Sequence, residues 1–472
     1  MKIKHYEIEI PSNQPFSNCR LHREQYAKVL TQIVKSYSDG FVLAINNEWG
    51  TGKTTFVKMW QQQLINENFQ TIYFNAWEND FNNNPLVAII SELKTLTKGK
   101  IKIESAFKSV LEKGAVLTKE VAPVLLKSLV KKYLIDTEVI TDAIENTTKA
   151  ATEILEKEIK EYSDKKKTIT EFRQELEKFI EKRENSQPLV FIIDELDRCR
   201  PNYAVETLEQ LKHFFSVNGI IFVLSIDKKH LASSVKGFYG SNEINAEEYL
   251  RRFIDLEYSI PKPSNKQFCK YLFDYFSLDD FFYSQERRKI NDFRNDAQLL
   301  LEMSELLFDK TYVTLRQQEK IFGQTRLVLN SFRYNQYTFS FLLFILIYLK
   351  TIQNELYQKI EDNILTIQQL YDEITNVIPI GVRNEYGFNT ITTVALLLHF
   401  YNNNRESQNR FKLLNHTNDG ITTPIKVKLG GHVDSNELAR AFNNIEQQSN
   451  FSNISLKYLI NKINLTESVI LS

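Results

Sequence analysis

Hydrophobic residues occur along the chain in two patterns, short continuous runs and longer stretches with helical spacing. Continuous runs of this length are typical of strands that are buried on both faces of a sheet. Between them, apolar residues recur at the spacing of one helix face, for example over residues 21–36 and 54–63. This alternation predicts an α/β fold with a parallel sheet. The predicted strands are residues 41–45, 71–77, 189–193 and 220–226.

A long segment of different character separates the second and third predicted strands. Residues 103–134 carry apolar positions at helical spacing, and residues 154–180 do the same among dense charges of both signs. Mixed charge is typical of a solvated helix or a coiled-coil arm, so it favours a packed helical hairpin over a nucleic-acid-binding arm. Beyond Pro263 long helical patterns dominate, and the polar stretch 401–404 is expected to be an exposed loop. We therefore expect a helical insertion and a helical C-terminal region.

Composition narrows the class of protein. The 472 residues are 42% hydrophobic and 25% charged, which is close to globular averages and unlike disordered chains. Lysine plus arginine (59) equals aspartate plus glutamate (59), so no overall field draws the protein to nucleic acid or to an anionic membrane. Binding to nucleic acid would need a local patch and is not indicated by charge.

The cysteines and the hydropathy of the chain predict the cellular compartment of the protein. The three cysteines are scattered and form no C-x-x-C pair, which argues against a disulfide framework and favours a reducing compartment. The first residues lack the apolar segment of a signal peptide. The apolar run 339–349 is shorter than the roughly 20 residues of a spanning helix, so we expect a buried helix there. These features predict a cytoplasmic protein without a transmembrane segment.

Candidate chemistry begins in the loop after the first predicted strand. In a strand, loop and helix context, main-chain N–H groups hold phosphate oxygens, Lys53 reaches the β- and γ-phosphates, and the Thr54 hydroxyl coordinates Mg²⁺. The usual motif begins with glycine, and Asn47 takes that place here. Asparagine tolerates positive φ, so we expect the turn to form and Asn47→Gly to be harmless. The residues expected to bind nucleotide are Asn47, Glu48, Trp49, Gly50, Thr51, Gly52, Lys53, Thr54 and Thr55.

Two carboxylates, Asp194 and Glu195, follow the third apolar run. Together with a phosphate-binding loop, such a pair favours catalysis over helix capping, because one carboxylate binds Mg²⁺ and the next polarises the attacking water. The metal ligands are then Thr54 and Asp194, and the catalytic residues include Lys53 and Glu195. ATP is expected rather than GTP because the chain has no Asn-Lys-x-Asp motif for guanine.

Polar residues also follow the fourth predicted strand. One of Ser225 and Asp227 could contact the γ-phosphate or the attacking water, and Asp227 suits equally the cap of the next helix. Arg251 and Arg252 close a helix before the apolar segment 256–260, which matches the arginine-finger region of AAA-type ATPases. Surface salt bridging is the competing explanation for this pair.

Four segments together resemble the KAP family of P-loop NTPases: EWG at 48–50, FNAWE at 74–78, DELDRC at 194–199 and YLRR at 249–252. That family carries a large helical insertion between its phosphate-binding loop and its acidic strand, as this chain does. The resemblance implies a P-loop NTPase domain formed by residues 1–93 and 187–263. Residues 94–186 are then the helical insertion, and residues 264–472 a helical lid and C-terminal domain.

The resemblance also implies roles. Residues 314–318 are similar to the second-sensor segment of related ATPases, which makes Arg316 a candidate nucleotide contact. A homo-oligomer is expected, with Arg251 and Arg252 acting on the neighbouring subunit's nucleotide. Bacterial members of the family include phage-exclusion and other antiviral proteins, so a role in bacterial antiphage defence is an expectation. Trp77 is expected to be a core aromatic.

Three functions stay open. The leading hypothesis is an ATP-hydrolysing switch or motor that engages a protein partner through the helical insertion or the C-terminal region. The second is a nucleic-acid-stimulated ATPase, against which the neutral charge argues. The third is a non-hydrolysing nucleotide-dependent scaffold, which Asn47 allows and Glu195 argues against.

Overall fold

In the computed structural model the chain divides into two compact units, residues 1–262 and 263–472. Each unit is described below by itself. The residues described are 8–37, 40–81, 84–97, 101–120, 148–183, 187–212, 217–310, 312–382, 389–417, 420–427, 435–448 and 453–470.

A five-stranded sheet occupies the centre of the first unit. Its strands are β1 (Phe41–Asn46), β2 (Thr71–Asn75), β3 (Leu189–Asp194), β4 (Ile220–Ile226) and β5 (Leu256–Tyr258). They are all parallel and follow the order β2-β3-β4-β1-β5. Every residue of β3 and β4 is buried, which explains why these strands appear in the sequence as continuous apolar runs. The predicted parallel α/β fold is confirmed.

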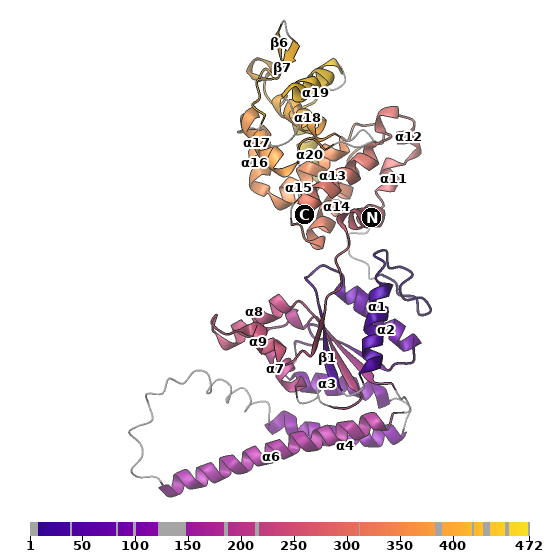
Figure 1. Ribbon diagram of the computed structural model, residues 1–472, viewed down its shortest axis with the longest axis vertical. Helices are drawn as coiled ribbons and strands as arrows, with labels where there is room; N and C mark the ends of the chain where they lie inside the picture. Colours follow the sequence, from indigo (N-terminus) through magenta and orange to yellow (C-terminus); the bar gives the residue numbers. More distant parts are fainter. Residues whose placement is uncertain are drawn as a thin grey trace. The chain divides into compact units, whose positions relative to one another are not determined.

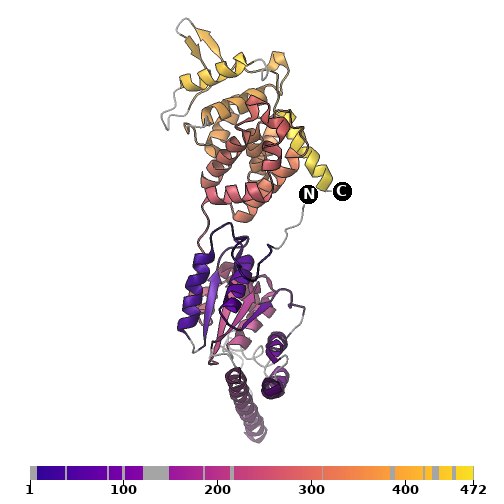
Figure 2. The same cartoon turned by 90° about the vertical axis from the view of Figure 1, so that its right-hand side faces the viewer.

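Helices cover both faces of the sheet (Figures 1 and 2). Successive residues of a strand point to opposite faces, so Leu43 and Ile45 pack against one helical layer while Val42 and Ala44 pack against the other. The first layer contains α1 (Glu24–Ser36) and α2 (Lys53–Asn66). The second contains α3 (Pro85–Leu93), η1 (Lys94–Thr97), α7 (Pro201–Leu211), α8 (Lys228–Tyr239) and α9 (Ala246–Arg251), and η2 (Leu196–Arg198) follows β3.

Two long helices, α4 (Ile101–Glu120) and α6 (Thr148–Glu181), lie between β2 and β3 in the sequence and pack side by side (Figure 1). Phe107 of α4 contacts Phe179 of α6, with ring centroids 5.4 Å apart. Lys113 and Glu171 form an ion pair of 2.6 Å between the same helices. The described residues of α4 and α6 are therefore helical, as predicted, and residues 121–134 of the expected first helix lie outside the described residues.

Where the structure describes the second unit, it is mainly helical, and β6 (Asn415–Thr417) and β7 (Gly420–Thr422) form a small hairpin. This hairpin was not predicted, because its short strands contain no apolar run. The helices are α10 (Asn265–Tyr275), α11 (Asp279–Phe282), α12 (Gln285–Arg288), η3 (Asn291–Phe293), α13 (Asp296–Lys310), α14 (Leu315–Leu329), α15 (Ser340–Ile352), α16 (Asn354–Glu361), α17 (Ile367–Val377), α18 (Thr390–Asn402), η4 (Ser407–Asn409), α19 (Ser435–Gln447) and α20 (Lys457–Ile470).

The most apolar run of the chain forms α15, whose residues 342–349 are all buried. This confirms the prediction of a buried core helix. Across the ranges that the structure describes, no helix combines the length and the apolar character needed to span a bilayer.

The expectation of an exposed loop at residues 401–404 is wrong. Asn402 and Asn403 are buried at the end of α18. The Asn402 amide donates to the Phe411 carbonyl and accepts from the Phe411 N–H, both at 2.8 Å, and Asn403 donates to the Ile454 carbonyl at 2.9 Å. These polar side chains satisfy main-chain groups of neighbouring segments, which is a reason for burial that a hydropathy pattern does not contain.

Candidate functional site

The candidate phosphate loop connects the end of β1 to the start of α2. Gly50 and Gly52 have left-handed φ angles of 80° and 76°, which glycine adopts without steric cost. A Cβ added at Gly52 would lie 3.1 Å from a guanidinium nitrogen of Arg23. The first main-chain bond of α2 runs from the Phe56 N–H to the Gly52 carbonyl at 3.0 Å. The N–H groups before Phe56 thus have no intrahelical acceptor, and this terminus suits phosphate oxygens.

Asn47 has a different task from the one predicted. It is not among the positive-φ residues of the described chain, so the expectation that it accommodates a left-handed turn is wrong. Its amide makes two hydrogen bonds with the main chain of Ile260, donating to the carbonyl at 2.7 Å and accepting from the N–H at 2.9 Å. Glu48 forms an ion pair with Lys262 at 3.0 Å. These hydrogen bonds and this ion pair hold the start of the loop against the segment that follows β5.

The Lys53 side chain is buried and folds back over the loop. Its ammonium donates to the main-chain oxygens of Asn47 and, at 3.4 Å, of Glu48. Burial lowers the pKa of Lys53, and attraction to three buried carboxylates opposes this shift, with Asp197 having the largest such effect. The cation is therefore held by carbonyl groups that a more negative acceptor can replace.

Asp194 ends β3 and is 1% exposed. Its two carboxylate oxygens accept hydrogen bonds from the Tyr73 hydroxyl and the Glu195 N–H, both at 2.9 Å. The strand register places Asp194 opposite Ser225 of β4, whose hydroxyl is buried without a hydrogen-bond partner. Carboxylate and hydroxyl oxygens are the hard ligands that Mg²⁺ prefers, so this edge of the sheet fits the expected metal.

Glu195 follows β3 with φ 61° and ψ 23°, a left-handed conformation that is uncommon for a residue with a side chain. Its carboxylate pairs with the Arg198 guanidinium at 2.9 Å and accepts from the Asn75 amide at 3.3 Å. Burial raises the pKa of Glu195, and the Arg198 charge works in the opposite direction. A partly buried carboxylate with a raised pKa at the edge of the sheet has the properties of a general base.

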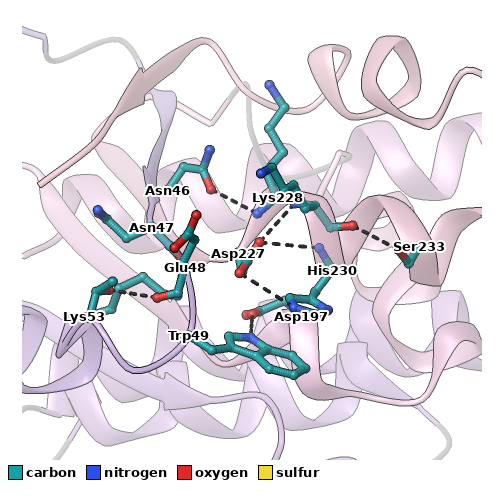
Figure 3. A network of polar contacts seen from close by, with 12 residues as sticks. Asn46, Asn47, Glu48, Trp49, Lys53, Asp197, Asp227, Lys228, His230 and Ser233 are labelled. Carbon is teal, nitrogen blue, oxygen red and sulfur yellow. Dashed lines mark hydrogen bonds and ion pairs between the residues drawn. The ribbon is translucent and has the colours of Figure 1, made fainter. Parts of the chain in front are cut away.

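Trp49 joins the loop to the segments after β3 and β4 (Figure 3). Its indole N–H donates to the Asp197 carboxylate, and its ring stacks on the His230 imidazole with centroids 3.6 Å apart and planes at 6°. Asp227 accepts hydrogen bonds from the N–H groups of Lys229 at 3.1 Å and of His230 at 3.4 Å. Of the two roles predicted for Asp227, the structure shows the helix cap.

The three predicted arginines lie at exposed positions. Arg251 and Arg252 end α9, where Arg251 pairs with Glu248 at 3.0 Å, as the salt-bridge explanation expects. Arg316 lies in the first turn of α14 and belongs to the second compact unit. Roles for these arginines at a nucleotide stay predictions.

The expectation that Trp77 is a core aromatic is wrong, because 54% of the residue is exposed. The strand ends at Asn75, whose side-chain oxygen accepts the Trp77 N–H at 3.1 Å and starts a turn. The Trp77 ring lies on the surface beside Arg198, whose guanidinium carbon is 5.8 Å from the ring centroid.

Sequence reasoning missed several residues that hold the site in place. Arg198 lies within the DELDRC segment, and its spacing from Glu195 is that of one helical turn, so this pair could have been found. Arg23 donates to the Thr51 carbonyl at 2.7 Å from the start of α1. No local pattern marks Arg23, because only folding brings it to the loop.

Comparisons with known proteins identify a family. Residues 23–381 match the KAP family P-loop domain. The solved ORC2 protein of Aeropyrum pernix, in ADPNP–ADP complexes, is 14% identical over 90% of this chain and 94% of that chain, with a TM-score of 0.34. A Drosophila ORC structure bound to DNA is 12% identical over 96% of this chain and 87% of that chain, with a TM-score of 0.24. The comparison with curated proteins gives no match.

Proposed function

The chain belongs to the KAP family of P-loop proteins, and on this basis we propose that it is a Mg²⁺-dependent ATPase that acts as a molecular switch. One observation supports this most directly. Lys53 begins α2 directly after the loop that follows β1, Asp194 ends β3, and both of these parallel strands flank β4, so the lysine and the carboxylate lie at the same edge of the sheet. A phosphate-binding cation, a metal ligand and a base in Glu195 are the parts that phosphoryl transfer to water requires.

Each residue then has a chemical task. Bound Mg²⁺ would supply positive charge that stabilises the phosphate oxygens. From this chain, the Thr54 hydroxyl and Asp194 would hold it, while the N–H groups of the loop and the Lys53 ammonium would bind phosphate. Glu195 would orient the attacking water and accept its proton, which its raised pKa favours.

The switch would act through the segment at the end of the first unit. Asn47 and Glu48 bind Ile260 and Lys262, which directly precede the second unit. A change in the loop on nucleotide binding or hydrolysis would therefore alter the contacts of that segment. We assign residues 94–186 to an insertion and residues 264–472 to a lid and C-terminal domain, and we expect one of these regions to bind the protein partner.

We further propose that the protein works as a homo-oligomer in which Arg251 and Arg252 stabilise the charge on a neighbour's nucleotide. A double variant lacking both arginines and a Glu195→Gln variant should each bind ATP without hydrolysing it. When they are mixed, interfaces that pair an intact site with intact arginines should restore part of the activity. If subunit exchange is verified and no activity returns, the arginines act on the nucleotide of their own subunit or only support the fold, as the Arg251–Glu248 pair does.

The cellular setting we propose is the cytoplasm, with a role in bacterial antiphage defence. The test is protection of a host against phage by the wild-type protein and loss of protection by Lys53→Ala. Phosphate-release assays with and without DNA or RNA separate this function from a nucleic-acid-stimulated ATPase, which the equal numbers of acidic and basic residues do not favour.

The decisive experiment measures ATP affinity by calorimetry and phosphate release on the same samples. Lys53→Ala should lose binding, because it removes the ammonium that lies over the loop and is expected to bind the phosphates. Glu195→Gln should keep binding and lose at least about 100-fold in turnover, since the amide cannot accept the proton. Lys28→Ala is the matched control, because Lys28 is an exposed lysine paired with Glu24 on α1. A wild-type protein that binds no ATP, or an active Glu195→Gln variant, would contradict the proposal.

A further inference from the structure

Trp49 of the phosphate loop contacts two other segments of the chain. Its indole N–H binds Asp197 of η2, and its ring face lies on His230 of α8. The hydrogen bond fixes where the N–H points, and the parallel stack at 3.6 Å fixes the plane of the ring. Two independent contacts therefore hold one loop side chain in a single orientation (Figure 3).

The acceptor of that N–H is a buried carboxylate, since Asp197 is 6% exposed. Burial raises the pKa of Asp197, and the Trp49 hydrogen bond and the charge of Lys53 oppose the shift. Lys53 and Asp197 thus attract each other. Nevertheless, the Lys53 ammonium donates to loop carbonyls, while Asp197 receives the indole N–H.

A buried carboxylate deprived of a hydrogen-bond donor takes a nearby cation as a substitute, because an unpaired charge is costly in a protein interior. Lys53 is the candidate cation, because its ammonium binds the carbonyls of Asn47 and Glu48, the two loop residues that directly precede Trp49. If the two paired, the charge that phosphate needs would already be neutralised. The tryptophan N–H provides Asp197 with a neutral donor instead.

We propose that Trp49 is a positioning residue for Lys53: by occupying the Asp197 carboxylate, its indole N–H leaves the Lys53 ammonium available to the phosphates of a nucleoside triphosphate. His230 supports this arrangement by holding the indole plane. The inference rests on the proposed function, since it concerns the same phosphate loop.

The test measures ATP affinity by calorimetry in a Glu195→Gln background, where turnover does not interfere. Trp49→Phe keeps an aromatic ring against His230 and removes the indole N–H. The affinity for ATP should fall roughly tenfold to a hundredfold, which corresponds to the free energy of one hydrogen bond to a charged group. Adding Asp197→Asn should restore affinity to within about threefold of Asp197→Asn alone, because the competing charge is gone. Trp77→Phe makes the same chemical change at an exposed tryptophan and should have no effect.

Rescue by Asp197→Asn separates positioning from a general loss of loop structure, which a second substitution would not repair. The proposal is overturned if Trp49→Phe binds ATP like Trp77→Phe, or if the double variant stays as weak as Trp49→Phe. If Trp49→Phe fails to fold, His230→Leu is the second variant, because it removes the ring that stacks on the Trp49 indole. His230→Leu should also weaken ATP binding, but by less than Trp49→Phe. The background protein and Lys53→Ala test ATP binding itself, so a failure of the proposed function is recognised separately.

Discussion

Arg287 of the second unit and the charged residues at the candidate site of the first unit are held in opposite ways. In the second unit Arg287 is 0% exposed and is surrounded by acceptors. It donates to the carbonyls of Tyr334 at 3.0 Å and Gln336 at 2.9 Å, to the Thr338 hydroxyl at 2.9 Å, and to the carboxylate of Asp296. Its guanidinium carbon also lies 4.1–5.9 Å from the centroids of three phenylalanine rings. These contacts give Arg287 a structural role.

In the first unit, the charges at the candidate site have fewer and weaker contacts. Lys53 is held by two loop carbonyls, and Glu195 by one arginine and one amide. A phosphate or a water molecule can replace such contacts at small cost, whereas nothing can replace the set around Arg287. The number and charge of the partners therefore distinguish the structural ion Arg287 from Lys53 and Glu195, whose few contacts suit the proposed chemistry.

The largest expected effect is on the structural ion. Arg287→Leu should lower the free energy of unfolding by about 3–5 kcal/mol, because it leaves Asp296 buried and unpaired. Urea denaturation measures the loss, and ATP affinity at the folded plateau should not change. Arg288→Leu, at the exposed next position, should stay within about 0.5 kcal/mol of wild type. A loss of similar size for both variants would show that the Arg287 contacts contribute little.

A smaller effect is expected at the start of the loop. Asn47→Gly removes two hydrogen bonds to Ile260 and should lower the free energy of unfolding by about 1–3 kcal/mol. ATP binding should also weaken, because the start of the loop is no longer held by Ile260. This replaces the expectation that the change is harmless. Asn47→Asp keeps an acceptor for the Ile260 N–H but turns a carboxylate oxygen toward the Ile260 carbonyl, so it should not recover the stability of the wild type. Wild-type stability and ATP affinity in Asn47→Gly would mean that the loop does not depend on this anchor.

Turnover should also depend on pH. In the proposed mechanism the attacking water needs ionised Glu195, and burial raises the pKa of that carboxyl above its ordinary value of 4.5. Activity should therefore fall as the pH drops through this raised pKa. Arg198→Gln removes a charge that lowers the pKa, so the acid limb of the kcat profile should move to higher pH. Arg200→Gln is the control, because Arg200 pairs with Asp80 instead. An acid limb that does not move in Arg198→Gln would separate Arg198 from the base.

The smallest effect is expected at the surface. Trp77→Ala should change the free energy of unfolding by no more than about 0.5 kcal/mol, since more than half of the residue is already in water. Thermal unfolding beside a buried control, Trp60→Ala, would test this. A loss comparable to that of the fully buried Trp60 would restore the core interpretation of Trp77.

Much of the architecture could be predicted from the chain because its signals are local. Strands buried on both faces must be apolar throughout, so β1, β3 and β4 appear as unbroken runs. The glycines of the phosphate loop and the acidic pair after β3 are likewise recognisable from neighbouring residues. The hairpin β6–β7 was missed because its short strands carry no such run.

Contacts between residues that are far apart in sequence became known only from the folded chain. The sequence predicts a turn residue at Asn47, but in the folded chain the Asn47 amide binds Ile260. It also predicts a core aromatic at Trp77, but β2 ends at Asn75, two residues before it. The partners of Trp49 come from two other segments of the chain. A residue's type limits which bonds it can make, but packing chooses the partner, because burial makes an unpaired polar group costly wherever the chain happens to place it.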